Sequence, residues 1–152
     1  MKVAKFVRLL LGSSIVSLSA VVFLTASAAY SQSADPGPIR SSAAYSEILL
    51  RKTEVLADLD AFSVEYTEEN PKMIELRAEL ASLNKQLEKV FGVKPSDTGK
   101  LTLALGKLIV KKASLEAELA RLSIRNSKDH PDVVRATRKL GIYDAAIKEV
   151  LR

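Results

Sequence analysis

The chain has 152 residues, no cysteine, one histidine and a formal net charge of +5. The absence of cysteine excludes disulfides, thiolate zinc sites and cysteine nucleophiles, and a single histidine excludes a multi-histidine metal site. The length allows one small domain.

Residues 1–28 have the pattern of a secretory signal peptide. Three basic residues precede a charge-free run over residues 9–26, and Ala26-Ser27-Ala28 is a small-x-small cleavage pattern. We therefore expect an exported protein, periplasmic or secreted. Cleavage removes three basic and no acidic residues, which lowers the net charge from +5 to +2. A small, mixed charge argues against a nucleic-acid partner.

The alternative for this segment is an inner-membrane anchor formed by residues 9–28, because about 20 apolar residues can span a bilayer. Contact with a membrane is expected only if the segment is not cleaved. Residues 29–41 follow with two prolines and a glycine, and they are expected to form a flexible linker.

The rest of the chain predicts an all-α fold. Apolar residues step by three and four over residues 42–66, 71–91, 101–126 and 131–151, and no segment alternates as a strand does. This spacing is a heptad seam, which suits helices that cross at about 20°. The residues expected to form the helix-packing seam are Leu59, Leu76, Leu80, Leu83, Leu87, Leu105, Leu108, Leu115, Leu119, Leu140, Tyr143 and Ile147.

Two similar breaks, Asn70-Pro71 and His130-Pro131, divide these helices into pairs. Proline fits the first turn of a helix and pushes the residue before it out of the helical conformation. Asn70 is a favoured N-cap, and His130 takes the matching position. We therefore predict two antiparallel helical hairpins, at residues 42–91 and 100–152, joined by a loop at residues 92–99.

The two predicted hairpins align with an offset of 60 residues and no gap. Lys52 then matches Lys112, Pro71 matches Pro131, and Leu80 matches Leu140. The match favours an internal duplication, although any two heptad hairpins of equal length align similarly. Whether the hairpins pack on each other or on other chains is left open. Residues 101–110 are apolar over more than one stripe, which favours several neighbours in a bundle or an oligomer.

Lys52 and Lys112 interrupt the apolar seam at matching positions. Paired cations there can bind an anionic ligand or an acidic partner. Alternatively, their stems lie on the seam while the ammonium groups reach water or a neighbouring carboxylate.

No residue of the sequence suggests catalysis or cofactor binding. His130 beside Asp129 and Asp132 can be drawn as a metal or acid–base site, but a cap at a helix start is the simpler interpretation. No phosphate loop, nucleophile elbow or zinc-protease motif occurs. We expect no catalytic residue, cofactor or metal, and a seam filled with leucine is expected to leave no substrate-sized pocket.

Two stretches carry a resemblance. YTEENPKMIELRAEL (residues 66–80) and NSKDHPDVVRATRKL (residues 126–140) resemble the hairpin tip in the periplasmic coiled-coil segment of exopolysaccharide chain-length determinant proteins, the polysaccharide co-polymerases. The resemblance implies an extended envelope hairpin and makes polysaccharide-export machinery a candidate partner. The transmembrane pair, α/β base and kinase found in that family have no counterpart in this sequence.

The sequence therefore predicts an exported, non-enzymatic structural or adaptor module of the cell envelope. It is expected to act by helix–helix packing with protein partners or with copies of itself. One alternative is a periplasmic holdase-type chaperone, to which the chain is similar in outline only. A second alternative is a small secreted all-α enzyme.

Overall fold

The computed structural model describes residues 37–152, so the predicted signal peptide and the first part of the linker lie outside the described residues. Six helical elements occupy this range: α1 (Gly37–Arg40), α2 (Ala43–Ser63), α3 (Pro71–Phe91), the 3-10 helix η1 (Pro95–Lys100), α4 (Leu103–Ser123) and α5 (Pro131–Leu151). No strand occurs between residues 37 and 152, and the all-α prediction is confirmed. The helical turn α1 falls within the segment predicted as a linker.

Each long helix starts at a polar cap. Ser42 and Thr102 cap α2 and α4 by accepting a hydrogen bond from the backbone N–H three residues ahead. Asn70 and His130 cap α3 and α5 with side-chain acceptors for the N–H of Lys72 and Asp132, and proline follows each cap. These side chains satisfy N–H groups that have no partner within the helix. Both prolines therefore start helices, as the sequence predicts.

α2 and α4 each end three residues earlier than the heptad spacing suggests. The apolar pattern continues to Tyr66, but the helix stops at Ser63 because the chain must turn before the Asn-Pro pair. Tyr66 still packs beside Phe62, with ring centroids 5.6 Å apart. The apolar spacing therefore predicts the last residue that packs on the seam. It does not predict where the helix ends, because the turn leading to the next helix cap and its proline decides that.

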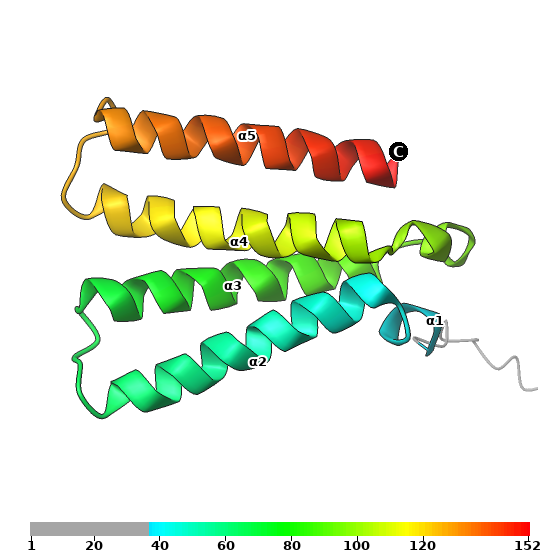
Figure 1. Ribbon diagram of the computed structural model, residues 1–152, viewed down its shortest axis with the longest axis horizontal. Helices are drawn as coiled ribbons and strands as arrows, with labels where there is room; N and C mark the ends of the chain where they lie inside the picture. The colour runs from blue at the N-terminus through cyan, green and yellow to red at the C-terminus, as the bar shows by residue number, and fades with distance from the viewer. Residues whose placement is uncertain (1–36) are drawn as a thin grey trace, which may run out of the picture. The chain divides into compact units, whose positions relative to one another are not determined.

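The four long helices form a bundle of successive antiparallel neighbours (Figure 1). α4 packs against α2, α3 and α5, which makes it the central helix of the described part. α2 and α4 run in the same direction, and α3 and α5 run opposite to them (Figure 1). The two hairpins thus pack on each other, with α4 lying against both helices of the first hairpin. The broad apolar surface of residues 101–110 serves these several neighbours.

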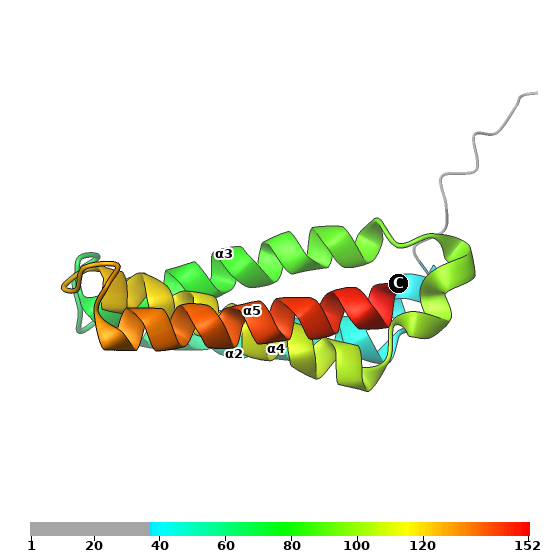
Figure 2. The same cartoon turned by 90° about the horizontal axis from the view of Figure 1, so that it is seen from above.

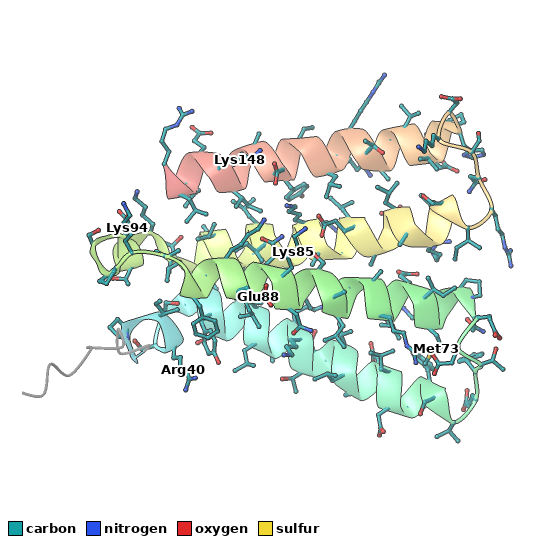
Figure 3. All side chains as sticks on the ribbon, turned by 180° about the vertical axis from the view of Figure 1, so that it is seen from behind. Arg40, Met73, Lys85, Glu88, Lys94 and Lys148 are labelled. Carbon is teal, nitrogen blue, oxygen red and sulfur yellow. The ribbon has the colours of Figure 1, made fainter. Side chains whose placement is uncertain are left out.

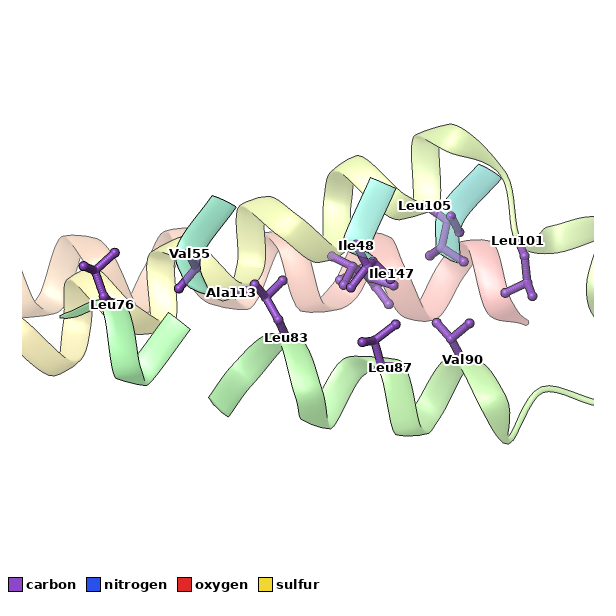
Figure 4. Packing of buried hydrophobic residues seen from close by; sticks show 12 residues of the cluster. Ile48, Val55, Leu76, Leu83, Leu87, Val90, Leu101, Leu105, Ala113 and Ile147 are labelled. Carbon is purple, nitrogen blue, oxygen red and sulfur yellow. The ribbon is translucent and has the colours of Figure 1, made fainter. Parts of the chain in front are cut away.

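The core lies where α2, α3 and α4 meet. Leu83, Leu87 and Val90 of α3 point toward the side chains of the other helices (Figure 4). Burying one such side chain stabilises the fold by about 1.5–3 kcal/mol. The backbone also joins the hairpins, since the Ala44 N–H donates to the Leu101 carbonyl at 3.2 Å. The buried apolar cluster comprises Ala44, Ile48, Val55, Leu76, Leu83, Leu87, Val90, Leu101, Leu105, Ile109, Ala113 and Ile147.

The offset of 60 residues holds for the structure as well as for the sequence. α2 and α4 begin and end at positions 60 apart, and so do α3 and α5. The turns repeat the same backbone bonds: Tyr66 N–H to Phe62 carbonyl in one tip corresponds to Asn126 N–H to Leu122 carbonyl in the other. The chain therefore contains a structural repeat of two equal hairpins.

None of the helices between residues 37 and 152 has the length and apolar character needed to cross a bilayer.

Candidate functional site

A cleft of about 190 Å³ opens between α3 and α5, with α4 as its floor. Its walls and floor are mainly apolar. For comparison, a cavity of about 150 Å³ can hold benzene, so this cleft has room for one or two apolar side chains. The lining residues are Gln86, Lys89, Val90, Val93, Leu105, Ile109, Lys112, Asp144, Ile147, Lys148 and Leu151.

The cleft exists because α5 packs almost entirely on α4. α5 also touches η1 near its C-terminus, where Lys100 Nζ donates to the Leu151 carbonyl at 3.3 Å. Among the described residues, α5 makes no comparable contact with α2 or α3. Seen from above, the ribbon of α5 overlaps those of α2 and α4, whereas α3 runs separately from α5 over most of its length (Figure 2). The sequence did not predict this cleft, because a leucine seam on each helix does not close the space between two helices that do not touch.

Gln86 contributes an uncharged polar group to the lining of the cleft. Gln86 is 3% exposed as a whole residue, and its amide makes no hydrogen bond with another described residue. No fully buried side-chain nitrogen or oxygen lacks a partner in residues 37–152, so the amide faces the open space of the cleft. Gln86 can donate two hydrogen bonds and accept two, so a group entering the cleft would find both kinds of partner there.

Lys112 and Asp144 form an ion pair along the cleft. Lys112 Nζ lies 2.8 Å from Asp144 Oδ1 and 3.7 Å from a Glu116 carboxylate oxygen, and Lys148 Nζ lies 2.7 Å from Asp144 Oδ2. The hydrogen bond from Lys112, followed by that from Lys148, lowers the pKa of Asp144 to about 2. Asp144 is therefore a carboxylate at neutral pH, and it neutralises the buried ammonium.

The mouth of the cleft is basic. Lys89 and Lys148 are exposed, whereas the 7% exposed Lys112 lies deeper. Lys94 follows on the connection after α3, at the same end of the bundle as Lys148 (Figure 3). The lining contains three lysines and one aspartate. The resulting excess of positive charge favours an acidic binding partner.

The two seam lysines differ in the structure. Lys112 is buried with carboxylate partners, and its matching residue Lys52 is half-buried on α2 with no ion pair among the described residues. Of the two interpretations drawn from the sequence, the one in which the ammonium group meets a neighbouring carboxylate fits Lys112. Lys112 lines the cleft, and Lys52 is not among the lining residues.

The predicted seam residues divide by depth. Leu76, Leu83, Leu87, Leu105, Leu115 and Ile147 are buried. Leu59, Leu80, Leu108, Leu119, Leu140 and Tyr143 are half-buried. Leu140 and Tyr143 on α5 are only half-buried because α4 is the one long helix against which α5 packs extensively.

A row of buried polar residues on α3 was not evident from the sequence. Glu79, at 4% exposed, accepts two hydrogen bonds from Arg51 at 2.7 and 2.9 Å, and Ser82 donates to Glu116. Gln86 continues this row. In a heptad pattern these positions look solvent-facing, and the signal that marks them is their own spacing of three and four.

The hairpin tips are turns. Lys72 N–H donates to Asn70 Oδ1 at 2.8 Å, and Asp132 N–H donates to His130 Nδ1 at 3.3 Å. His130 thus uses one ring nitrogen as a helix cap. No cluster of three or more metal-ligating side chains occurs in residues 37–152.

Comparisons of this chain with protein-family models, curated proteins and solved structures find no match.

Proposed function

We propose that this chain is a non-enzymatic structural or adaptor module of the cell envelope. In this proposal the cleft between α3 and α5 receives apolar side chains from an acidic, amphipathic helix of a partner protein. The observation that carries the proposal is the open side of α5, which leaves an apolar cleft between two parallel helical walls. Helix-in-groove binding uses this kind of surface.

The chemistry of the lining supports such a partner. Apolar side chains of the partner would cover Val90, Ile109 and Ile147, and a polar group of the partner would form a hydrogen bond with the Gln86 amide. Carboxylates beside the apolar stripe of the partner would meet Lys89 and Lys148 at the mouth. Such charges increase the rate of encounter and fix orientation more than they increase affinity.

The leader pattern supports the envelope as the location. The hairpin-tip resemblance makes polysaccharide-export machinery one candidate for the source of the partner helix. The tip sequences themselves are explained by the turn that any antiparallel helix pair needs, and they do not identify a partner. The identity of the partner is therefore a result that the experiment has to supply.

The test is site-specific photo-cross-linking in the cells that produce the protein. A photo-reactive residue at Val93, inside the cleft, is compared with one at the exposed tip residue Thr67. We expect one discrete adduct of fixed mass from Val93 and none from Thr67. The pair of changes Lys89→Glu and Lys148→Glu should abolish the adduct, whereas Lys72→Glu with Lys85→Glu, on exposed positions outside the cleft, should not.

Other outcomes overturn the proposal. Many adducts that increase when envelope proteins unfold would indicate a holdase. The absence of an adduct, or adducts of the chain with itself alone, would mean that the cleft has no partner helix.

A further inference from the structure

We propose that copies of this chain stack head to tail through the same interface that joins its two hairpins. The outer face of α2 in one copy would dock on the α4–α5 pair of the next copy, as α4 docks on the α2–α3 pair within the chain. This inference uses faces other than the cleft and does not depend on the proposed function.

The internal repeat shows which faces are free. The pair α2–α3 receives α4, but the equivalent pair α4–α5 receives no helix in the described part of the chain. Likewise α4 contacts the preceding hairpin, whereas within residues 37–152 no hairpin precedes α2, its equivalent. A second copy, placed on the first as the second hairpin is placed on the first hairpin, would cover the α4–α5 face of one copy and the α2 face of the other.

The outer face of α2 is apolar where this docking requires it. We define this face by Leu49, Leu50, Thr53, Leu56 and Ala57, which are all exposed. The equivalent residues of α4 are Ile109, Val110, Ala113, Glu116 and Ala117, all buried or half-buried by the first hairpin. The three leucines expose 41%, 59% and 45% of their surfaces. Exposed leucines gathered on one helix face mark an interaction surface.

Contacts between the hairpins predict contacts between copies. Within the chain, Ser82 of α3 donates a hydrogen bond to Glu116 of α4. Shifted by the repeat, this pair becomes Ile142 of one copy and Leu56 of the next. Ile142 is 69% exposed, and its burial against Leu56 would remove two apolar side chains from water.

The repeat also predicts a close approach between the helices of two copies. Gly106 of α4 lies against Ala44 of α2, where an added Cβ would lie 2.9 Å from the Ala44 Cα. The shifted pair is Ser46 and Ala104, and both are small and exposed. Small residues at this point let the two backbones approach.

Charges on the two faces are complementary. The charged residues of α2 in the exposed class are Glu54, which also pairs with Arg51 at 3.0 Å, and Asp60, and both are acidic. The α4–α5 face is basic, with Lys107, Lys111, Arg135 and Lys139 at the positions equivalent to Glu47, Arg51, Glu75 and Glu79. The in-chain salt bridge of Glu75 with Arg121 is not reproduced, because its equivalents are Arg135 and Ala61, but Asp60 precedes Ala61. Opposite charges favour this pairing over face-to-face pairing of two α2 helices.

The proposal predicts a heterologous contact, in which two different faces meet. Leu56→Glu blocks the α2 face, and Ile142→Glu blocks the α4–α5 face. Sedimentation velocity of the purified protein over a range of concentrations should show association of the wild type, weakened roughly tenfold or more by either change because a carboxylate enters an apolar contact. Ala145→Glu, at an exposed position of α5 outside the contact, should have no effect.

Mixing the two blocked variants separates head-to-tail stacking from symmetric pairing. Each variant keeps the face that the other lacks, so the mixture should form dimers that do not grow further. Because the chain has no cysteine, Leu56→Cys and Ile142→Cys variants should form a disulfide dimer on oxidation only when mixed. A disulfide dimer of Leu56→Cys alone, or a wild type that stays monomeric, would overturn the proposal; the latter result would leave the α2 face to a different protein.

Discussion

Gly106 of α4 touches Ala44 of α2 so closely that a Cβ on the glycine would lie 2.9 Å from the Ala44 Cα and from the Glu47 Cβ. Gly141 of α5 is a second glycine in mid-helix, and an added Cβ there would meet nothing within 4 Å. The two glycines have the same helix propensity but different surroundings. They are therefore a matched pair for measuring how tightly the hairpins pack.

Alanine should have opposite effects at these two positions. In a free helix, glycine to alanine gains about 1 kcal/mol, so we expect Gly141→Ala to stabilise the fold by about 0.5–1 kcal/mol. At Gly106 the overlap with backbone atoms should outweigh this gain, and overpacking costs about 1–3 kcal/mol. Urea unfolding of both variants checks the prediction. Equal stabilisation at both positions would mean that the first hairpin does not receive α4 as described.

Arg51 and Glu79 provide a second test, of a buried charge. Arg51→Ala leaves the Glu79 carboxylate, 4% exposed, without its two hydrogen bonds. Loss of one partner of a buried pair costs about 3–5 kcal/mol. Replacing both partners, with Arg51→Met and Glu79→Leu, should recover most of this stability because no charge is left buried.

A half-exposed pair is the control for this result. Arg121 and Glu75 lie 3.1 Å apart with side chains 42% and 28% exposed, and Arg121→Ala should cost no more than about 1 kcal/mol. Chemical denaturation of the three variants gives the ranking. If Arg51→Ala lowered the free energy of unfolding as little as Arg121→Ala does, water would have to reach the Glu79 carboxylate.

The Arg51–Glu79 pair also shows where sequence reasoning stops. Apolar spacing and the two Xaa-Pro breaks predict four helices and their order, because local chemistry decides where helices start. Glu79 and Gln86 fall outside the heptad seam and therefore look exposed in the sequence. Glu79 is buried where it meets Arg51 of α2, and Gln86 lies in the cleft lining with Leu105 and Ile109 of α4. Only tertiary packing places those helices there.

The position of α5 was equally inaccessible to sequence reasoning. All four helices carry similar seams, and the seam on α5 matches that on α3. The seam includes Ile147 and leaves out Ile142, which agrees with their exposures of 7% and 69%, but it does not say which helix Ile147 packs against. The cleft was missed for the same reason, since a heptad seam predicts contact with one partner and does not specify which helices remain apart.

The two caps offer a test of the repeat at its tips. Asn70 is a preferred N-cap, and its oxygen accepts from the Lys72 N–H at 2.8 Å; the equivalent bond to His130 is longer, at 3.3 Å. Asn70→Ala should cost about 1 kcal/mol. His130→Asn places the better cap in the second tip and should stabilise the fold by a few tenths of a kcal/mol or more. Thermal unfolding measures both changes. A lower melting temperature for His130→Asn would mean that the imidazole has a role other than capping.

Asp144 predicts how stability depends on pH. Hydrogen bonds from Lys112 and then Lys148 lower its pKa from the ordinary value of 3.8 to about 2. A carboxyl with a lowered pKa in the folded state adds stability above its unfolded pKa, and this stability is lost as the pH falls through the folded pKa. Asp144→Asn should therefore be less stable than the wild type at neutral pH, and the two should converge between about pH 4 and pH 2.

The matched control is Glu149→Gln, on the same helix. Glu149 is exposed and makes no ion pair with another described residue, so its change should give no comparable convergence. Urea midpoints at several pH values measure the difference between each variant and the wild type. A difference for Asp144→Asn that stayed constant down to pH 2 would mean that the loss comes from packing around Lys112. In that case the charge of Asp144 would contribute nothing, and the buried ammonium would have to be neutralised by Glu116, whose carboxylate lies 3.7 Å from it.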